Sequence, residues 1–115
     1  MAKDNDCIFC KLANGDIPTN LLYENDLAAA FADANPQAPV HVLVVPKDHY
    51  ANIIDGIPAD VLAAMVDAVD HVAREHGLDK AGFRTIMNTG EAAGQTVNHV
   101  HMHILGGTSL GEGLL

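Results

Sequence analysis

Between Pro58 and His76, apolar residues recur every three or four positions, while acidic residues take the other faces. The apolar positions are Val61, Leu62, Met65, Val69 and Val72, and the acidic ones are Asp60, Asp67, Asp70 and Glu75. This period matches the turn of an amphipathic α-helix. Gly77, with Arg74 and His76 just before it, favours the end of the helix at that point. The pattern therefore predicts one long helix with a single apolar face.

Near the N-terminus, residues 7–14 show a shorter helical pattern with Ile8, Leu12 and Phe9 on one side. Gly15 follows as a typical C-terminal stop, so we expect a short helix there. Apolar residues in 21–24 and 27–33 then flank the turn-forming pair Asn25-Asp26. This arrangement is typical of a β-hairpin, although the alanines at positions 28–30 are poor strand formers.

Three further apolar runs predict strands. Residues 40–45 are rich in β-branched side chains and are closed by Pro46, which indicates a central strand. Residues 83–88 and 97–105 predict two more strands, joined by the glycine-containing loop 89–96. Most connections are too short for parallel crossovers. The order of elements indicates an α+β fold, with an antiparallel sheet of about five strands, one long helix and one short helix.

Length and composition narrow the possible classes. The 115 residues fit one domain, with a core at about residues 7–107 and a C-terminal tail at 108–115. No apolar stretch approaches the roughly 20 residues that span a bilayer. Residues 1–6 lack the basic and apolar segments of a secretory signal, so we expect a soluble, cytoplasmic protein with no membrane partner. A net charge of −9 with only six Lys and Arg residues argues against binding of extended nucleic acid.

The most informative segment is residues 99–104, where histidines alternate with aliphatic residues. A strand would put His99, His101 and His103 on one face, with successive imidazoles roughly 7 Å apart. Three interpretations are open at this point. The histidines are exposed on an edge strand, they share a metal ion, or they perform covalent catalysis with one imidazole as nucleophile and another moving a proton.

The loop before these histidines favours the third interpretation. Gly90, Gly94, Gln95 and Thr96 offer backbone N–H groups and a hydroxyl that can bind an anion beside the imidazoles. Glycines in such a loop more often serve only the turn, so the loop alone is weak support. Together with the histidine segment, it predicts a phosphate-binding site.

The segment 99–105 matches the His-φ-His-φ-His-φ-φ signature, where φ is an apolar residue, and resembles the histidine triad (HIT) family. The segments 94–107, 34–41 and 44–49 also resemble the Hint branch of that family, so the similarity extends over nearly the whole chain. The resemblance implies a single HIT domain with a HIT-like fold. It also implies a hydrolase that binds a nucleotide.

Site residues follow from the resemblance position by position. It implies that His101 is the nucleophile, that His103 contacts the α-phosphate and helps to protonate the leaving group, and that His41 supports them. It also implies that the Thr96 hydroxyl helps to pass a proton to the leaving group. The implied nucleotide-binding residues are Ile8, Phe9, Leu12, Ile17, Phe31, Asp33, Asn88, Gly94, Gln95, Thr96, His101 and His103. Among these, Asp33 is the implied ligand of the ribose hydroxyls, and the apolar residues also suit an ordinary core.

Cys7 and Cys10 have the spacing of half a tetrahedral zinc site, which needs two more ligands. A redox pair and two uninvolved thiols remain alternatives. Similarity to HIT proteins with the same Cys-x-x-Cys start implies that His49 and His99 complete a structural zinc site. No requirement for Mg²⁺ is expected, because the sequence has neither a P-loop nor a carboxylate cluster.

The sequence leaves three main functions open. The leading one is hydrolysis of nucleoside 5′-phosphoramidates or related nucleotide conjugates at the α-phosphate, through a covalent nucleotidyl-histidine. The others are a purine nucleotide-binding regulatory module with incidental turnover, and a dinucleoside polyphosphate hydrolase. A zinc hydrolase that uses all three strand histidines is less favoured, because the cysteine pair would compete for His99. The small size and the similarity to Hint proteins also predict a homodimer.

Overall fold

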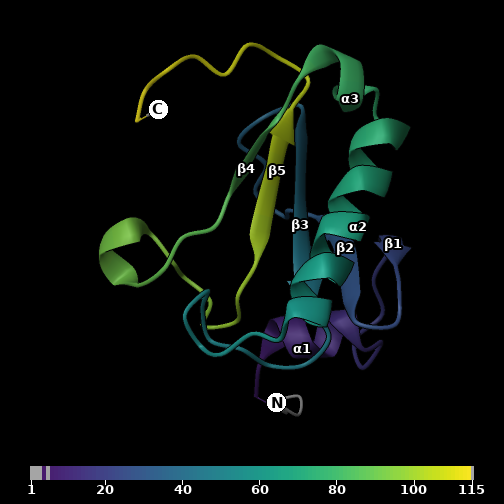
Figure 1. The fold of residues 1–115 in the computed structure, drawn as a ribbon, viewed down its shortest axis with the longest axis vertical. Coiled ribbons are helices and arrows are strands. Elements are labelled where there is room, and N and C mark those ends of the chain that lie inside the picture. Colours follow the sequence, from purple (N-terminus) through teal and green to yellow (C-terminus); the bar gives the residue numbers. More distant parts are fainter. Residues whose placement is uncertain (1–3, 5, 115) are drawn as a thin grey trace.

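The computed structural model describes Asp4 and residues 6–114, so the remaining positions of the predicted domain, residues 1–3, 5 and 115, lie outside it. The helices are α1 (Ile8–Ala13), α2 (Ala59–Glu75), α3 (Leu78–Ala81) and the 3-10 helix η1 (Glu91–Ala93). The strands are β1 (Leu21–Glu24), β2 (Ala28–Ala32), β3 (Val40–Pro46), β4 (Arg84–Ile86) and β5 (Met102–Gly106). All strand pairs are antiparallel, in the order β1-β2-β3-β5-β4 (Figure 1). The predicted α+β fold is confirmed.

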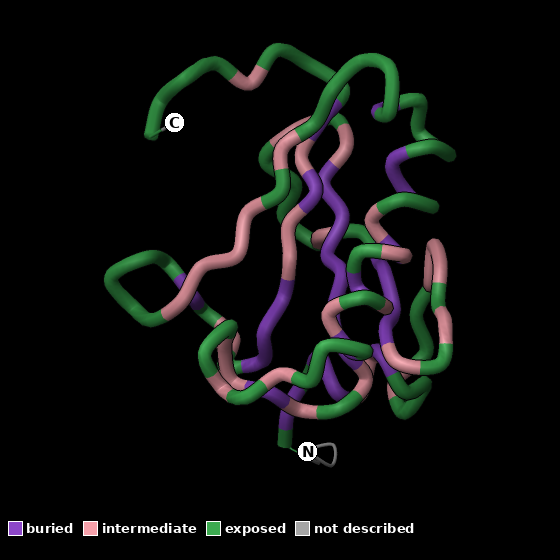
Figure 2. Tube along the Cα trace, viewed as in Figure 1, coloured by how far each residue is buried: buried purple, intermediate pink, exposed green. Residues whose placement is uncertain are grey.

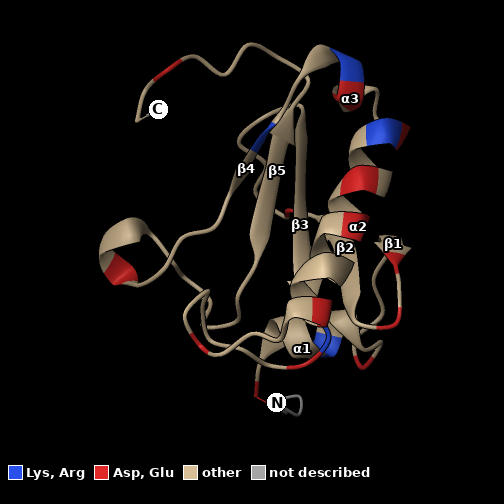
Figure 3. Cartoon of the chain, in the orientation of Figure 1, with Lys and Arg blue, Asp and Glu red and all other residues tan. Residues whose placement is uncertain are grey.

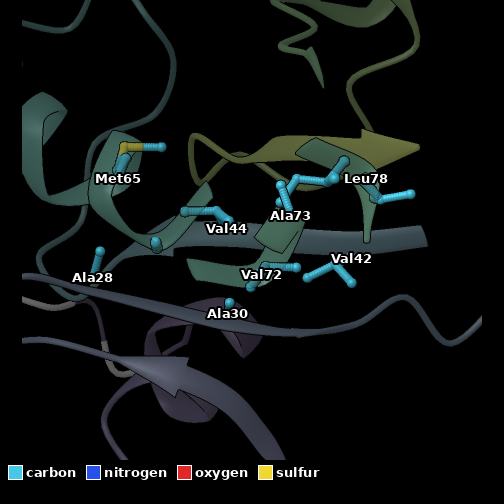
Figure 4. Packing of buried hydrophobic residues seen from close by; sticks show 10 residues of the cluster. Ala28, Ala30, Val42, Val44, Met65, Val72, Ala73 and Leu78 are labelled. Carbon is cyan, nitrogen blue, oxygen red and sulfur yellow. The ribbon is translucent and has the colours of Figure 1, made fainter. Parts of the chain in front are cut away.

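One face of the sheet is covered by α2, which runs along the strands in Figure 1. The buried cluster between them includes Met65 and Val72 of the helix and Val42, Val44 and Ile104 of the sheet (Figure 4). Met65 and Val72 belong to the apolar stripe of the helix that the helical period predicted. The opposite side of α2 carries exposed acidic residues, visible as red segments in Figure 3.

The other face of the sheet receives α1. Residues of β2 and β3 alternate between the two faces, so Ala29, Phe31, Leu43 and Val45 pack in a second cluster with Phe9 and neighbouring residues of α1. Figure 2 shows β2 and most of β3 as buried ribbon. The alanines at 28–30 are fully buried, and their small side chains allow helices to pack closely on both faces. Tertiary packing thus outweighs the weak strand propensity of alanine.

Several elements differ from the prediction. The strands expected over 83–88 and 97–105 are shorter, at Arg84–Ile86 and Met102–Gly106, because β3 pairs with β5 only as far as Val44↔Met102. The short helix α3 and the 3-10 helix η1 were not predicted. Gly77 ends α2 in the left-handed conformation, as expected, and α3 follows at once. No helix in the part of the chain that the structure describes is long and apolar enough to cross a membrane.

Met65 lies on the sheet-facing side of α2 and is fully buried, whereas the next residue, Val66, is 60% exposed. We therefore expect Met65→Ala to lower the free energy of unfolding by about 2–5 kcal/mol, because it removes buried methylene groups and leaves a cavity. The matched variant Val66→Ala should change it by less than about 0.5 kcal/mol. Urea unfolding of both variants at one protein concentration measures the difference, and equal unfolding midpoints would contradict this packing.

Candidate active site and metal centre

The three alternating histidines gather on the face of the sheet that α1 covers. Only His103 lies within β5, where it is paired with Leu43 of β3. His99 and His101 come just before the strand, and both are buried. Here the chain leaves the sheet because the N–H of Val100 donates to the carbonyl of Tyr50. The three histidines therefore lie on one face as predicted, although most of the segment does not pair with a neighbouring strand.

A backbone hydrogen bond fixes the proton position of His101. Its Nδ1 lies 2.7 Å from the carbonyl oxygen of His99, and a carbonyl only accepts hydrogen bonds. Nδ1 therefore carries the hydrogen, and in the neutral ring the Nε2 electron pair is free. The rings of Phe9 and His101 pack edge to face, with centroids 5.1 Å apart at 83°. The free electron pair of Nε2 therefore belongs to a ring that packs against an apolar side chain.

His103 forms a hydrogen-bonded pair with His41 of β3. His41 Nε2 lies 2.8 Å from His103 Nδ1, and the same nitrogen lies 3.3 Å from a carboxylate oxygen of Asp33. Burial lowers the pKa of His103, with a smaller lowering from the nearby His101 and His41 and an opposing effect of Asp33. The ring of His103 lies 5.0 Å from that of His101, measured between centroids. The two imidazoles can therefore act on one ligand.

His101, His103 and Asp33 border a cavity of about 470 Å³. Its apolar walls come mainly from α1, β2 and β3, and its other polar groups are the hydroxyls of Thr19 and Thr96. A mostly apolar pocket with a few convergent polar groups suits a small ligand such as a nucleoside. A second cavity, of about 400 Å³, shares Ile8, Thr96 and Val97 with the first. This neighbouring space also has Asp4 and Asp6 in its lining, so it is acidic.

Cys7, Cys10, His49 and His99 form a separate cluster whose ligand atoms all lie within 4.8 Å of one another. The Nδ1 of His99 is 3.3 Å from each sulfur, and the Nδ1 of His49 is 3.4 Å from Cys10 Sγ. Tetrahedral zinc, with Zn–S of about 2.3 Å and Zn–N of about 2.0 Å, separates sulfur and nitrogen ligands by about 3.5 Å. The four side chains therefore have the composition and the spacing of a closed zinc site.

Hydrogen bonds outside the cluster orient its ligands. His99 Nε2 donates to the carbonyl of Pro46 at 2.8 Å, which leaves the Nδ1 electron pair directed at the sulfurs. Burial lowers the pKa of His99 to about 4, so the ring is neutral at pH 7. Burial also raises the pKa of the Cys10 thiol to about 11, although the N–H of Asp4 acts in the opposite direction. A bound cation would reverse this effect and deprotonate the thiol.

Comparison with known proteins agrees with this arrangement of histidines. The description of the HIT domain matches residues 14–110, which is most of the chain. The chain belongs to the HIT family. A HIT-family relative, the purine nucleoside phosphoramidase of Escherichia coli (strain K12), is 39% identical over 107 residues, covering 90% of this chain and 89% of the relative.

Solved structures of the HIT family have the same fold. A histidine triad protein from Clostridium difficile superposes with a TM-score of 0.90 at 47% identity, covering 96% of this chain and 98% of that one. A HIT family hydrolase from Clostridium thermocellum superposes with a TM-score of 0.90 at 42% identity, covering 98% and 100%. The similarity therefore includes proteins described as hydrolases.

Within this HIT domain, the main cavity brings together most of the implied nucleotide-binding residues: Ile8, Phe9, Leu12, Phe31, Asp33, Thr96, His101 and His103. It does not bring in four others. Ile17 is half-buried outside the cavity lining, and Asn88 borders a different cavity beside β4. Gly94 and Gln95 lie in the loop with η1 but do not line the cavity. Sequence reasoning missed five other lining residues, which carry no distinctive chemical signal in the sequence: Thr19, Ala32, Ala34, Leu43 and Val97.

The loop before the histidines uses its N–H groups internally. Gly90 N–H donates to the Gln95 side chain, Gly94 N–H to the carbonyl of Glu91, and Gln95 N–H to the carbonyl of Gly90. The Gln95 amide also donates to the carbonyls of Ala51 and Val97. These N–H groups were expected to bind phosphate, and here they hold the loop together. Thr96, which ends this loop, lines the cavity, and its role there stays a prediction.

Proposed function

We propose that this HIT protein is a Hint-like hydrolase that cleaves nucleoside 5′-phosphoramidates or related nucleotide conjugates at the α-phosphate. The observation that carries the proposal is the bond from His101 Nδ1 to the carbonyl of His99, which frees Nε2 as a nucleophile in a nucleoside-sized cavity. The name of the Escherichia coli relative supports the reaction class. The aromatic rings of Phe9 and Phe31 suit a purine base, and Asp33 suits the ribose hydroxyls.

In the proposed reaction, Nε2 of His101 attacks phosphorus and the bond from phosphorus to the leaving nitrogen breaks. The nitrogen takes up a proton, for which His103 and the Thr96 hydroxyl are donors at the cavity wall. Water then attacks phosphorus, the bond to His101 breaks, and a proton from water replaces the one that was given. The products are a nucleoside monophosphate and an amine. No step uses Mg²⁺, and its dispensability stays a prediction, as does the cytoplasmic location.

The nucleophile is tested by His101→Ala, which should abolish turnover and change nucleotide affinity by no more than roughly tenfold. The reason is that the pocket walls stay while the only group proposed to bond to phosphorus is removed. His71→Ala is the matched control, because His71 is a half-exposed histidine on α2. Alkaline quenching of the wild-type reaction should give one nucleoside monophosphate on the peptide that carries His101. An adduct on His103 instead would reverse the two roles.

We further propose that Cys7, Cys10, His49 and His99 hold a structural zinc ion. The sulfur and nitrogen donors suit zinc, and four protein ligands leave no open position for catalysis. The ion would tie α1 to the segment that precedes the nucleophile. Its binding would also stabilise the thiolates, each of which accepts a backbone N–H bond here.

Protein prepared without chelators should therefore contain about one zinc ion per chain by elemental analysis. Cys7→Ser and His49→Ala should each lose the zinc and lower the Tm, because removal of one ligand opens the site. His71→Ala should keep both the zinc and the Tm. Fully folded, active wild-type protein with two free thiols and no zinc would refute the site.

We expect adenosine or guanosine phosphoramidates to be hydrolysed with a higher kcat/KM than dinucleoside polyphosphates. Among the residues that the structure describes, no Lys or Arg lines either cavity at the site. The neighbouring cavity carries Asp4 and Asp6, so a polyphosphate would add negative charge to an acidic surface. Figure 3 likewise shows β3 and β5 without charged residues. Parallel kinetics with both substrate classes decide the order. A tenfold preference for a diadenosine polyphosphate would overturn it and leave the His101 mechanism intact.

We also propose that the protein is a homodimer. The outer strand β4 is paired on one side only, with β5, so its other edge is open to a second copy. Pairing of two such edges would extend the sheet and bury further surface of a small domain. Sedimentation at micromolar concentration should give the mass of two chains, and a monomer at all concentrations would contradict the proposal.

A further inference from the structure

A backbone N–H group of the loop that leads into β3 points at the His41–His103 pair. Gln37 N–H donates to Nδ1 of His41 at 2.9 Å. Gln37 lies between Pro36 and Pro39 in the loop that leads into β3, and His41 is buried. Proline restricts the backbone, so this loop presents the N–H in a defined direction. Unlike a hydroxyl, a backbone amide cannot rotate to become an acceptor.

This bond determines where the hydrogen of His41 lies. Because Nδ1 accepts from Gln37, it carries an electron pair, and the neutral ring has its hydrogen on Nε2. His41 Nε2 is 2.8 Å from His103 Nδ1, so His41 is the donor and His103 Nδ1 is the acceptor. The hydrogen of neutral His103 is then on Nε2.

We infer that the backbone N–H of Gln37 is a positioning group that fixes the order of hydrogens in the His41–His103 pair, so that His103 meets the substrate as a neutral imidazole with its donor at Nε2. The inference rests on the proposed function only for the identity of that substrate. Gln37 acts through His41 and does not itself touch the nucleotide.

The same order makes His103 resist a second proton. A hydrogen added to its Nδ1 would face the N–H of His41 at 2.8 Å. Desolvation acts in the same direction, since burial lowers the pKa of His103. The groups facing the two rings are Asp33, which favours protonation, and His101, which opposes it.

The order of hydrogens also argues against a metal ion at Asp33, His41 and His103, whose ligand atoms lie close enough to hold one. A metal on His41 Nε2 would require the hydrogen on Nδ1, against the N–H of Gln37. Instead, His41 Nε2 donates to His103 Nδ1, and a carboxylate oxygen of Asp33 lies 3.3 Å from the same His41 nitrogen.

The test is the tautomeric state of each histidine in ¹⁵N-labelled full-length protein at pH 7 without substrate. Two-bond proton–nitrogen correlation spectra should show His41 and His103 with hydrogen on Nε2, and His101 with hydrogen on Nδ1 as an internal reference of the opposite kind. Hydrogen on Nδ1 of His41 or of His103 would overturn the inference. No turnover is measured, so this result and the test of the proposed function can fail separately.

Two variants then assign the effect to the N–H of Gln37. Gln37→Pro removes that N–H, whereas Gln37→Ala keeps it. In Gln37→Pro, His41 Nδ1 can take a hydrogen, so we expect mixed tautomers and a protonation midpoint of His103 that is higher by on the order of one pH unit. Gln37→Ala should match the wild type. Identical tautomers and midpoints in all three proteins would refute the role of Gln37, and if Gln37→Pro does not fold, the wild-type spectra still decide the order of hydrogens.

Discussion

The side chain and backbone of His99 connect the main parts of this site. Its Nδ1 faces the sulfurs of Cys7 and Cys10, its Nε2 donates to the end of β3 at Pro46, and its carbonyl holds the Nδ1 hydrogen of His101. The ring is completely buried. One residue therefore contacts the cysteines at α1, the end of β3 and the ring of the proposed nucleophile.

The two faces of the sheet differ in composition: one holds an apolar core, and the other holds the histidines of the proposed site. The face under α2 is apolar and carries no titratable side chain in its buried cluster. The face under α1 combines Phe31 and Leu43 with His41, Asp33 and His103, because the alternation along β2 and β3 puts odd-numbered residues on this side. Burial on this side of the sheet lowers the pKa of His99 and of His103. Hydrogen bonds to backbone carbonyl and N–H groups, which do not titrate, determine which nitrogen of His41 and of His101 carries the hydrogen.

The main cavity carries little charge for a site proposed to bind a nucleotide. The polar groups at the main cavity are two imidazoles, two hydroxyls and one carboxylate, and no Lys or Arg among the described residues lines it. Fixed dipoles of this kind stabilise charge that develops during a reaction without reorganising. They also avoid a strong permanent attraction for polyanions, which is consistent with the net charge of −9.

The sequence by itself determined the helical stripe of α2, the hairpin, the central strand and the α+β class, because those elements follow from local periodicity and turn residues. It also identified the histidines and the cysteine pair, whose chemistry is visible in their residue types and spacing. The structure alone decided that the histidine segment is mostly outside the ladder and that Gln95 binds its own loop. Those outcomes depend on backbone groups from distant segments, such as the carbonyls of Tyr50 and Pro46 and the N–H of Gln37. Every residue type except proline offers the same backbone groups, so only their placement in three dimensions could assign these roles.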